Sequence, residues 1–202
     1  MELTKSYRLL DREGEKMKKF ELTAEYVTNI FGKKLFRIKA LVEFGIVKEG
    51  ELGGFVEKES NIDDDGNAWV SGNAQVFGNA KISGNAQVYG NAKVFGNAWV
   101  YGNAWISGNA QVYGNACVAE NLDYAIVGGF GSEQQTITFF CQKDGSVGAK
   151  CGFFYGTLEE FREKVLETHG ESKYAREYLM IADLIELHFA GGSNGTEDGE
   201  NQ

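Results

Sequence analysis

The 202-residue chain contains no proline, three cysteines and two histidines. No stretch approaches the roughly 18 consecutive apolar residues of a membrane-spanning helix, and the first residues lack the long apolar core of a secretory signal. Cys117, Cys141 and Cys151 cannot form a closed set of disulfides and lack metal-ligand spacing, so we expect reduced thiols in a cytoplasmic protein. We therefore expect no membrane partner and no metal site.

Positive charge is also scarce over most of the chain. The net charge is −9, and residues 119–202 hold 6 basic against 15 acidic residues. Because contacts with phosphates need lysine and arginine, we do not expect duplex nucleic acid as a partner. The lysines and the arginine within residues 16–39 are interpreted as a solvated face.

Residues 66–118 return to Gly-Asn-Ala every six residues, nine times in a row. A valine or isoleucine follows each alanine by two positions, which places both side chains on the same face of a short strand. The Gly-Asn pair suits a corner, because glycine readily adopts a positive φ and asparagine tolerates it. Three such hexads can close a triangular coil of 18 residues, and stacked coils form parallel sheets around an interior of small side chains.

These [Val/Ile]-x-Gly-Asn-Ala-x hexads resemble those of left-handed parallel β-helices, the prism fold of the hexapeptide-repeat acyltransferase superfamily. The upstream run GELGGFVEKESN, residues 50–61, resembles the start of phage and prophage hexapeptide-repeat proteins with a transferase-like label. The resemblance implies a left-handed helix of three to four coils, and proteins with this fold commonly assemble as trimers. It also implies a catalytic histidine on a coil or inserted loop, and this repeat has neither.

We expect a mainly β protein in four parts. Either Phe55 or Val56, together with Ile62, is interpreted as a degenerate core position, and the aspartates at 63–65 as a corner or bulge. The expected parts are an N-terminal α/β cap at 1–52, the β-helix at 53–122, an α+β domain at 123–190 and a disordered acidic tail at 191–202.

The C-terminal domain is expected to contain strands followed by two helices. Residues 124–129, 136–142 and 147–156 read as strands, with a hairpin turn at Asp144-Gly145. Thr157 with Glu160 three residues later predicts a capping box, and Gly170 predicts the end of that helix. A second helix is expected over about 172–189.

Outward-facing side chains of the repeat are the candidate binding residues. Eight of the 18 outward positions are aromatic, and these rings with one lysine form the predicted site: Trp69, Phe77, Tyr89, Lys93, Phe95, Trp99, Tyr101, Trp105 and Tyr113. The plainer alternative is that aromatic ladders only stabilise the sheets. However, so many rings make a larger apolar patch than soluble monomers usually expose, so we expect a cover. Self-association comes first, the flanking domains second, and a ligand or foreign partner third.

The sequence therefore predicts a non-enzymatic, phage-type binding or assembly protein without a cofactor. We expect a homotrimer that sequesters a host defence protein, or a small nucleotide signal whose bases stack on the rings. One alternative is an acyltransferase that uses acetyl-CoA, with His169 as its base. Another is a structural virion component. Otherwise His169 and His188 are read as structural groups at helix ends.

Overall fold

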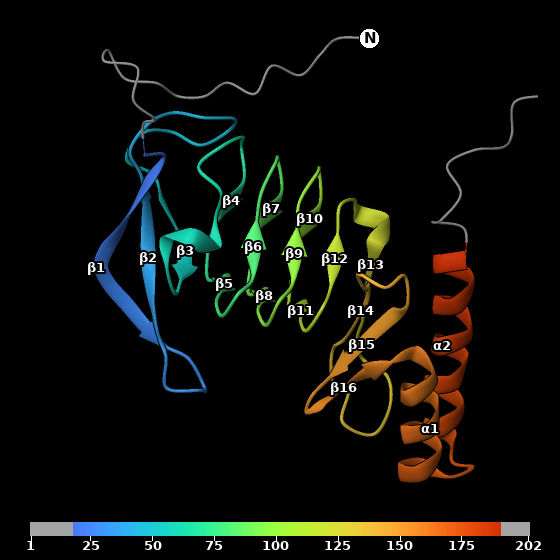
Figure 1. Cartoon of the computed structure of the whole chain (residues 1–202). Helices are drawn as coiled ribbons and strands as arrows, with labels where there is room; N and C mark the ends of the chain where they lie inside the picture. The colour runs from blue at the N-terminus through green and yellow to red at the C-terminus, as the bar shows by residue number, and fades with distance from the viewer. Residues whose placement is uncertain (1–17, 191–202) are drawn as a thin grey trace, which may run out of the picture. The chain divides into compact units, whose positions relative to one another are not determined.

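Each hexad forms a two-residue strand followed by a turn in the computed structural model, which describes residues 18–190 (Figure 1). The strands are β4 (Trp69–Val70), β5 (Gln75–Val76), β6 (Lys81–Ile82), β7 (Gln87–Val88), β8 (Lys93–Val94), β9 (Trp99–Val100), β10 (Trp105–Ile106), β11 (Gln111–Val112) and β12 (Cys117–Val118). The second residue of every strand is fully buried, as is the alanine two positions before it, to within 1%. Small and β-branched side chains therefore fill the interior, as the repeat predicts.

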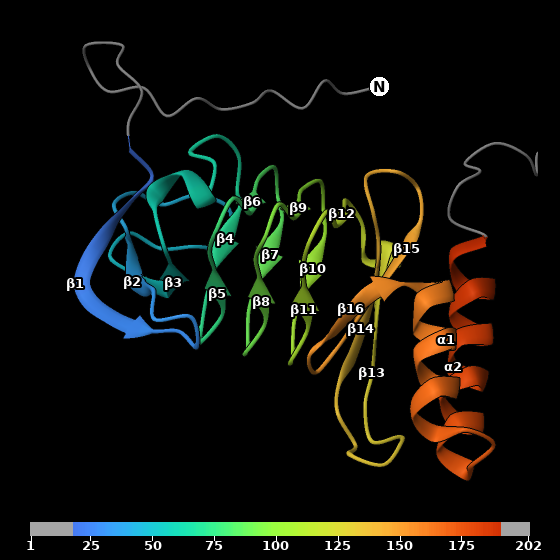
Figure 2. The same cartoon turned by 60° about the horizontal axis from the view of Figure 1, so that its bottom comes forward.

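The strands stack into three parallel sheets, as Figures 1 and 2 show. One sheet contains β4, β7 and β10, another contains β6, β9 and β12, and the third contains β3 (Leu52–Val56) followed by β5, β8 and β11. Equivalent residues of successive coils pair 18 positions apart, so that Gln87 lies between Trp69 and Trp105. An outward side chain therefore has neighbours of the coils above and below on the same face.

Glycine and asparagine have different roles at the corners. All nine hexad glycines have a positive φ, between 59° and 77°. Within residues 18–190 the only non-glycine residue with a positive φ is Gln134. Contrary to our expectation, the asparagines therefore do not adopt a positive φ. Their amides instead hydrogen-bond from coil to coil, as in the ladder of Asn67, Asn85 and Asn103 at 3.0 and 3.1 Å.

The solenoid begins before the regular repeat. Val56 pairs with Val76 and Ile62 with Ile82, which confirms both as core positions of a preceding coil. This coil spans 20 residues from Val56 to Val76, two more than the others. The extra residues fall in the 63–65 segment, where the corner was predicted. The 3-10 helix η1 (Glu59–Asn61) precedes it, and Asn61 is fully buried with its amide bonded to the carbonyl of Ala80 at 2.8 Å.

An antiparallel hairpin extends the sheet that begins with β3. Its strands are β1 (Phe20–Thr28) and β2 (Lys34–Ala40), and β2 pairs with β3. The expected α/β cap is thus a β hairpin in the part described, since residues 18–51 contain no helix. The turn-rich or helix-like start lies mostly in residues 1–17, outside the described residues. Leu35 and Ile38 are fully buried, so the hairpin has its own apolar contacts.

The chain divides into two compact units between Asn121 and Leu122. After the 3-10 helix η2 (Asn121–Asp123), the second unit forms a four-stranded antiparallel sheet. Its strands are β13 (Tyr124–Val127), β14 (Ile137–Cys141), β15 (Val147–Cys151) and β16 (Phe154–Thr157). The run 147–156, expected as one strand, forms two, because the chain turns at Gly152 with φ of 53°. The predicted turn at Asp144-Gly145 joins β14 to β15.

Two helices pack on this sheet, α1 (Leu158–His169) and α2 (Lys173–Ala190). Thr157 Oγ1 accepts a bond from Glu160 N at 3.2 Å and Glu160 Oε2 accepts one from Thr157 N at 2.7 Å, which confirms the capping box. Gly170 ends α1 with a φ of 55°. The acidic tail at 191–202 lies outside the described residues.

The predicted fold class is confirmed: the protein is mainly β, with a β-solenoid of about four coils and a further antiparallel sheet with helices. No helix within residues 18–190 is long and apolar enough to cross a membrane.

Candidate binding surface on the solenoid

The N-terminal hairpin covers a column of aromatic rings formed by Phe77, Phe95 and Tyr113. Phe77 and Phe95 stack at 4.8 Å between ring centroids, and Tyr113 follows at 4.4 Å. Only 6% of Phe77 and 8% of Phe95 remain exposed, because they form an apolar cluster with Leu35 and Phe55. The expectation that these two rings are exposed is therefore wrong, and a flanking segment of the same chain provides the cover.

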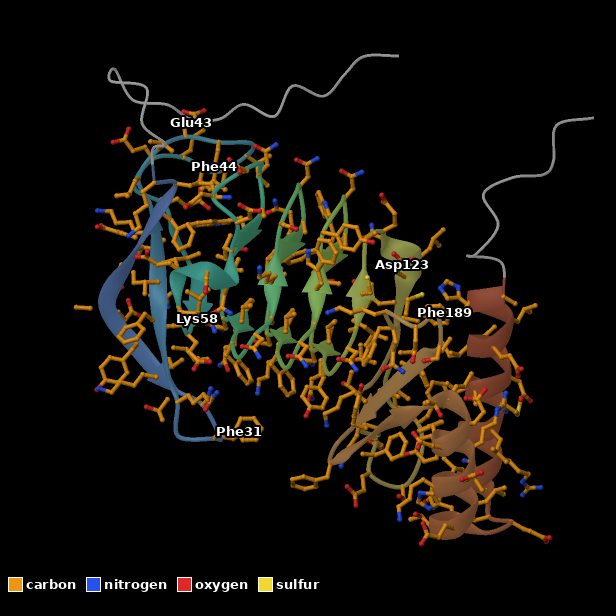
Figure 3. All side chains as sticks on the ribbon, in the orientation of Figure 1. Phe31, Glu43, Phe44, Lys58, Asp123 and Phe189 are labelled. Carbon is orange, nitrogen blue, oxygen red and sulfur yellow. The ribbon has the colours of Figure 1, made fainter. Side chains whose placement is uncertain are left out.

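Phe31, at the tip of the β1–β2 turn, adds to this cover (Figure 3). Its ring centroid lies 6.1 Å from that of Phe77 and 6.4 Å from that of Phe95. Lys33 on the same turn donates to Glu57 Oε1 at 2.8 Å, and Gly78 N donates to Glu57 Oε2 at 2.6 Å. Glu57 therefore ties the turn to the solenoid.

The pKa of Glu57 reflects this double role. Partial burial raises the pKa, but the hydrogen bonds from Lys33 and the Gly78 amide lower it more, so that it lies below its ordinary value. The carboxylate is therefore ionised near neutral pH and holds both partners. Sequence reading missed this group, because Lys33 and Glu57 are 24 residues apart and neither belongs to the repeat.

Trp69 is also buried, contrary to the expectation of an outward, exposed ring. It is 2% exposed, and its ring lies edge-on to Phe44 at 5.4 Å and to Phe20 at 6.3 Å between centroids. Its indole N–H has no hydrogen-bond acceptor among the described residues. A buried donor without an acceptor costs about 1–3 kcal/mol, so apolar packing must offset it here.

A buried lysine anchors the same region. Lys19 is fully buried, and its ammonium donates to the carbonyl oxygens of Asp63 at 2.6 Å and Ala68 at 3.0 Å. The charge lies 4.9 Å from the centroid of the Phe44 ring. The interpretation of this lysine as part of a solvated face is therefore wrong. Nothing in its local sequence marks it, because its acceptors are backbone groups 44 to 49 residues further along the chain.

Four aromatic rings remain at least partly exposed on the other two faces, and together we call them the outer aromatic surface: Tyr89, Trp99, Tyr101 and Trp105. Tyr89, Trp99 and Trp105 are 38%, 42% and 49% exposed, and Tyr101 is half-buried. They form two pairs. Trp99 stacks on Tyr101 at 4.3 Å with 24° between the planes, and Tyr89 meets Trp105 edge-on at 6.4 Å.

Neighbouring polar groups fix the rings of the outer aromatic surface. Trp99 Nε1 donates to Ser83 Oγ at 3.0 Å, which leaves the indole with no unmet donor. The backbone N of Trp105 donates to Asn121 Oδ1 at 2.8 Å. Lys81 is exposed and pairs in register with Trp99, whereas Lys93 is half-buried between Gln75 and Gln111. The surface therefore offers stacking faces and one free-standing ammonium group, and no carboxylate of the strands accompanies them.

Catalytic groups are not gathered on this surface. His169 and His188 lie in the last turns of α1 and α2. The His169 ring lies 5.5 Å from that of Tyr178, and His188 Nε2 lies 3.1 Å from the carbonyl oxygen of Leu122. Within residues 18–190 no group of three or more His, Cys, Asp or Glu side chains is placed to hold a metal ion.

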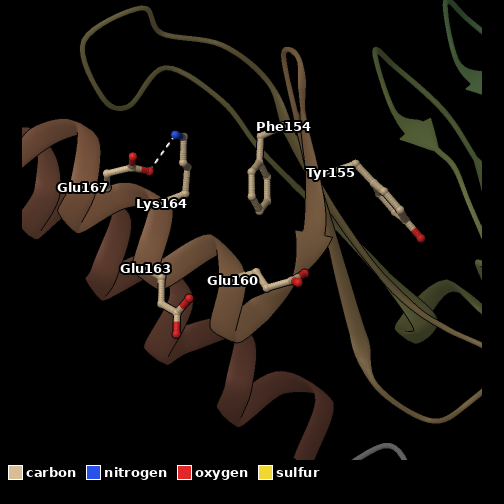
Figure 4. A pocket seen from close by; sticks show the side chains of 6 residues that line it. All are labelled: Phe154, Tyr155, Glu160, Glu163, Lys164 and Glu167. Atoms are coloured by element: carbon tan, nitrogen blue, oxygen red, sulfur yellow. Dashed lines mark hydrogen bonds and ion pairs between the residues drawn. The ribbon is translucent and has the colours of Figure 1, made fainter.

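The second unit has an open depression between β16 and α1 (Figure 4). Its lining residues are Phe154, Tyr155, Glu160, Glu163, Lys164 and Glu167. Glu160 closes the capping box, and Lys164 pairs with Glu167 at 2.6 Å. Burial raises the pKa of the Cys151 thiol elsewhere on this sheet, which keeps the thiol protonated and weakly nucleophilic. These groups explain helix stability and supply no paired nucleophile and base.

Comparison with known proteins agrees with this geometry. A family model described as the YdcK β-solenoid repeat matches residues 86–102, the span that contains β7, β8 and β9. The chain contains a β-solenoid repeat. The match includes Tyr89, Trp99 and Tyr101. A search of curated proteins finds no match to the chain. The phage-type and transferase-like parts of the resemblance remain predictions.

Proposed function

We propose that the protein is a non-enzymatic binding and assembly protein that acts through the outer aromatic surface. The observation that supports this proposal is the difference in burial among the eight aromatic rings of the repeat. The hairpin and first coil bury Trp69, Phe77 and Phe95, and Tyr113 is half-buried against Phe95, whereas both ring pairs of the outer aromatic surface stay open. Exposed rings grouped in this way typically mark an interaction site.

The proposed assembly is a homotrimer in which copies of the solenoid cover one another's rings. In a three-fold ring, one face of each copy packs against a different face of the next copy. The Tyr89–Trp105 pair suits such a contact, since each ring then meets another ring or an aliphatic side chain. Aromatic residues contribute strongly to such interfaces. Rings that the assembly leaves open are proposed to bind the second partner.

We further propose that this partner is a host molecule, in keeping with a phage-type protein that acts in the cytoplasm of the host cell. A small nucleotide signal fits the Trp99–Tyr101 stack, because a base can stack on the exposed Trp99 ring while Lys81, the register neighbour of Trp99, meets a phosphate. A host defence protein would use the same rings as anchors.

Sedimentation velocity of the full chain tests the assembly. We expect a trimer for the natural sequence and a monomer for the double variant Tyr89→Ser/Trp105→Ser. The matched control is Phe153→Ser, which removes a fully exposed ring from the second unit and should leave the trimer intact. A natural chain that sediments as a monomer, or a double variant that remains trimeric, contradicts the assembly.

Native mass spectrometry of protein purified from the producing cells tests the bound partner. A small added mass that disappears in Trp99→Ser supports a nucleotide, and a co-purified polypeptide lost in the same variant supports a protein. Bare protein from cells that contain the natural host components contradicts sequestration. Heat released on titration with acetyl-CoA would instead favour the acyltransferase.

A further inference from the structure

Helix α2 presents an apolar stripe on the side opposite to its core. The core side consists of Ala175, Tyr178, Ile181, Ala182 and Ile185. On the outer side Met180, Leu184 and Leu187 are 72%, 62% and 72% exposed. Their spacing of four and then three residues places them on one face of the helix. A helix that is apolar on two sides is normally covered on both.

Helix α1 extends this stripe. Arg162 of α1 donates to Asp183 at 2.5 Å and to Glu186 at 2.7 Å, which sets Arg162 level with the second half of α2. The two helices run antiparallel, so Leu166, one turn beyond Arg162, lies level with the turn of α2 that contains Met180. Leu166 is 51% exposed. We call these four residues, Leu166, Met180, Leu184 and Leu187, the helical apolar stripe.

Residues 191–202, which follow α2, supply no apolar cover. Residues 191–202 read GGSNGTEDGENQ and contain no aliphatic or aromatic side chain. An apolar surface gains stability only from contact with other apolar groups, which this segment lacks. The cover must therefore come from elsewhere.

The charges along α2 favour a second copy in antiparallel orientation. Lys173, which pairs with Glu177, and Arg176 lie in the first turns of the helix, whereas Asp183 and Glu186, which share Arg162 of α1, lie in its second half. Arg176 is exposed and forms no ion pair within residues 18–190. These pairs leave the positive charge of Arg176 in the first half of α2 and one negative charge in the second half. Antiparallel packing of two α2 helices therefore sets opposite net charges together, and parallel packing would set like charges together.

We propose that the helical apolar stripe is a self-association surface on which α2 of a second copy packs antiparallel. Met180 and Leu184 of each copy then pack against each other near the two-fold axis, and Arg176 lies beside the acidic half of the second copy's α2. Because the stripe is small compared with a stable dimer interface, we expect a dissociation constant on the order of 10 µM. This contact does not depend on the outer aromatic surface.

Sedimentation equilibrium of the full chain over about 1 to 100 µM tests the contact by mass action. We expect the mass to double over this range, from monomer to dimer or from trimer to hexamer if the solenoid also assembles. Leu184→Glu should raise the dissociation constant of the contact at least about tenfold, because it places a carboxylate there. The control Ile46→Glu makes the same change at a residue that is 76% exposed in the first unit, and it should double as the natural chain does.

Oxidation of Met180 by hydrogen peroxide gives a second readout in the natural chain. Its thioether is open in a single copy and covered in the pair, so oxidation should slow at least about threefold between the ends of the concentration range. Leu184→Glu should abolish this slowing. A mass that does not double, or doubling and slowing that persist in Leu184→Glu, overturns the proposal. If the mass does not double and Met180 is oxidised at the same rate at all concentrations, the helical apolar stripe binds a different protein and not a second copy.

Discussion

Two glycines of the same coil allow a sharp test of how tightly the coils stack. Gly102 and Gly108 occupy equivalent hexad positions, with φ of 59° and 63°. A Cβ at Gly102 would lie 2.6 Å from the carbonyl oxygen of Ala119, whereas a Cβ at Gly108 would have no atom within 4 Å. Alanine at either position meets the same backbone strain, so any difference in stability reports the contact between coils.

The expected magnitudes follow from these distances. A left-handed conformation costs a residue with a Cβ about 1–2 kcal/mol, which is our expectation for Gly108→Ala. Gly102→Ala must also displace a backbone carbonyl, and overpacking of this kind adds about 1–3 kcal/mol. We therefore expect a loss of about 2–5 kcal/mol for Gly102→Ala.

Urea unfolding followed by tryptophan fluorescence measures both variants, and the free energies are compared with that of the natural chain. Circular dichroism of the folded variants should show the same strand content, which confirms that each still forms the solenoid. Equal losses for the two variants, or a larger loss for Gly108→Ala, would refute the close stacking of Gly102 beneath Ala119.

Three further predictions concern the groups that hold the ends of the two units. Lys19→Met should lower the free energy of unfolding by about 1–3 kcal/mol, because it leaves buried carbonyl oxygens without a donor; urea unfolding measures the loss, and an unchanged midpoint counts against the buried contact. Glu57 has a pKa below its ordinary value of 4.5, so its stabilisation is present above that value and is lost as the pH falls through the lowered pKa. Glu57→Gln should therefore flatten the fall in melting temperature below about pH 5, and an identical pH profile would contradict this role. Thr157→Ala should cost about 1 kcal/mol through loss of the capping box, seen as a lower thermal midpoint, whereas no change would mean that the cap contributes nothing.

The repeat made the solenoid predictable, because period, side-chain size and corner residues all indicate the same shape. Nine buried valines and isoleucines at one hexad position leave no other face for the core. The capping box at Thr157 and the turn at Gly145 were predictable for a similar reason, since each depends on residues close in sequence.

The fate of the outward rings depended on contacts between distant segments. Trp69 and Trp105 occupy equivalent outward positions, yet one is 2% and the other 49% exposed. The difference comes from Phe20 and Phe44, which precede the repeat and show no periodicity that relates them to Trp69. Lys19 was misread because its partners are backbone carbonyls, which leave no mark in a sequence.

The central claim is that the aromatic rings lie outside a solenoid interior filled by alanine and valine, and that they serve for binding. Acrylamide quenching of tryptophan fluorescence tests this claim most directly. Trp99→Phe/Trp105→Phe retains only Trp69, and Trp69→Phe retains the other two. The account predicts that Trp69 is shielded at every protein concentration and that Trp99 and Trp105 are quenched in the dissociated chain. Trp105 becomes shielded once the chain assembles, and Trp99 becomes shielded once the partner binds. The account is contradicted if Trp99 and Trp105 are shielded in a dissociated chain, or if Trp105 stays open to the quencher in the assembled one.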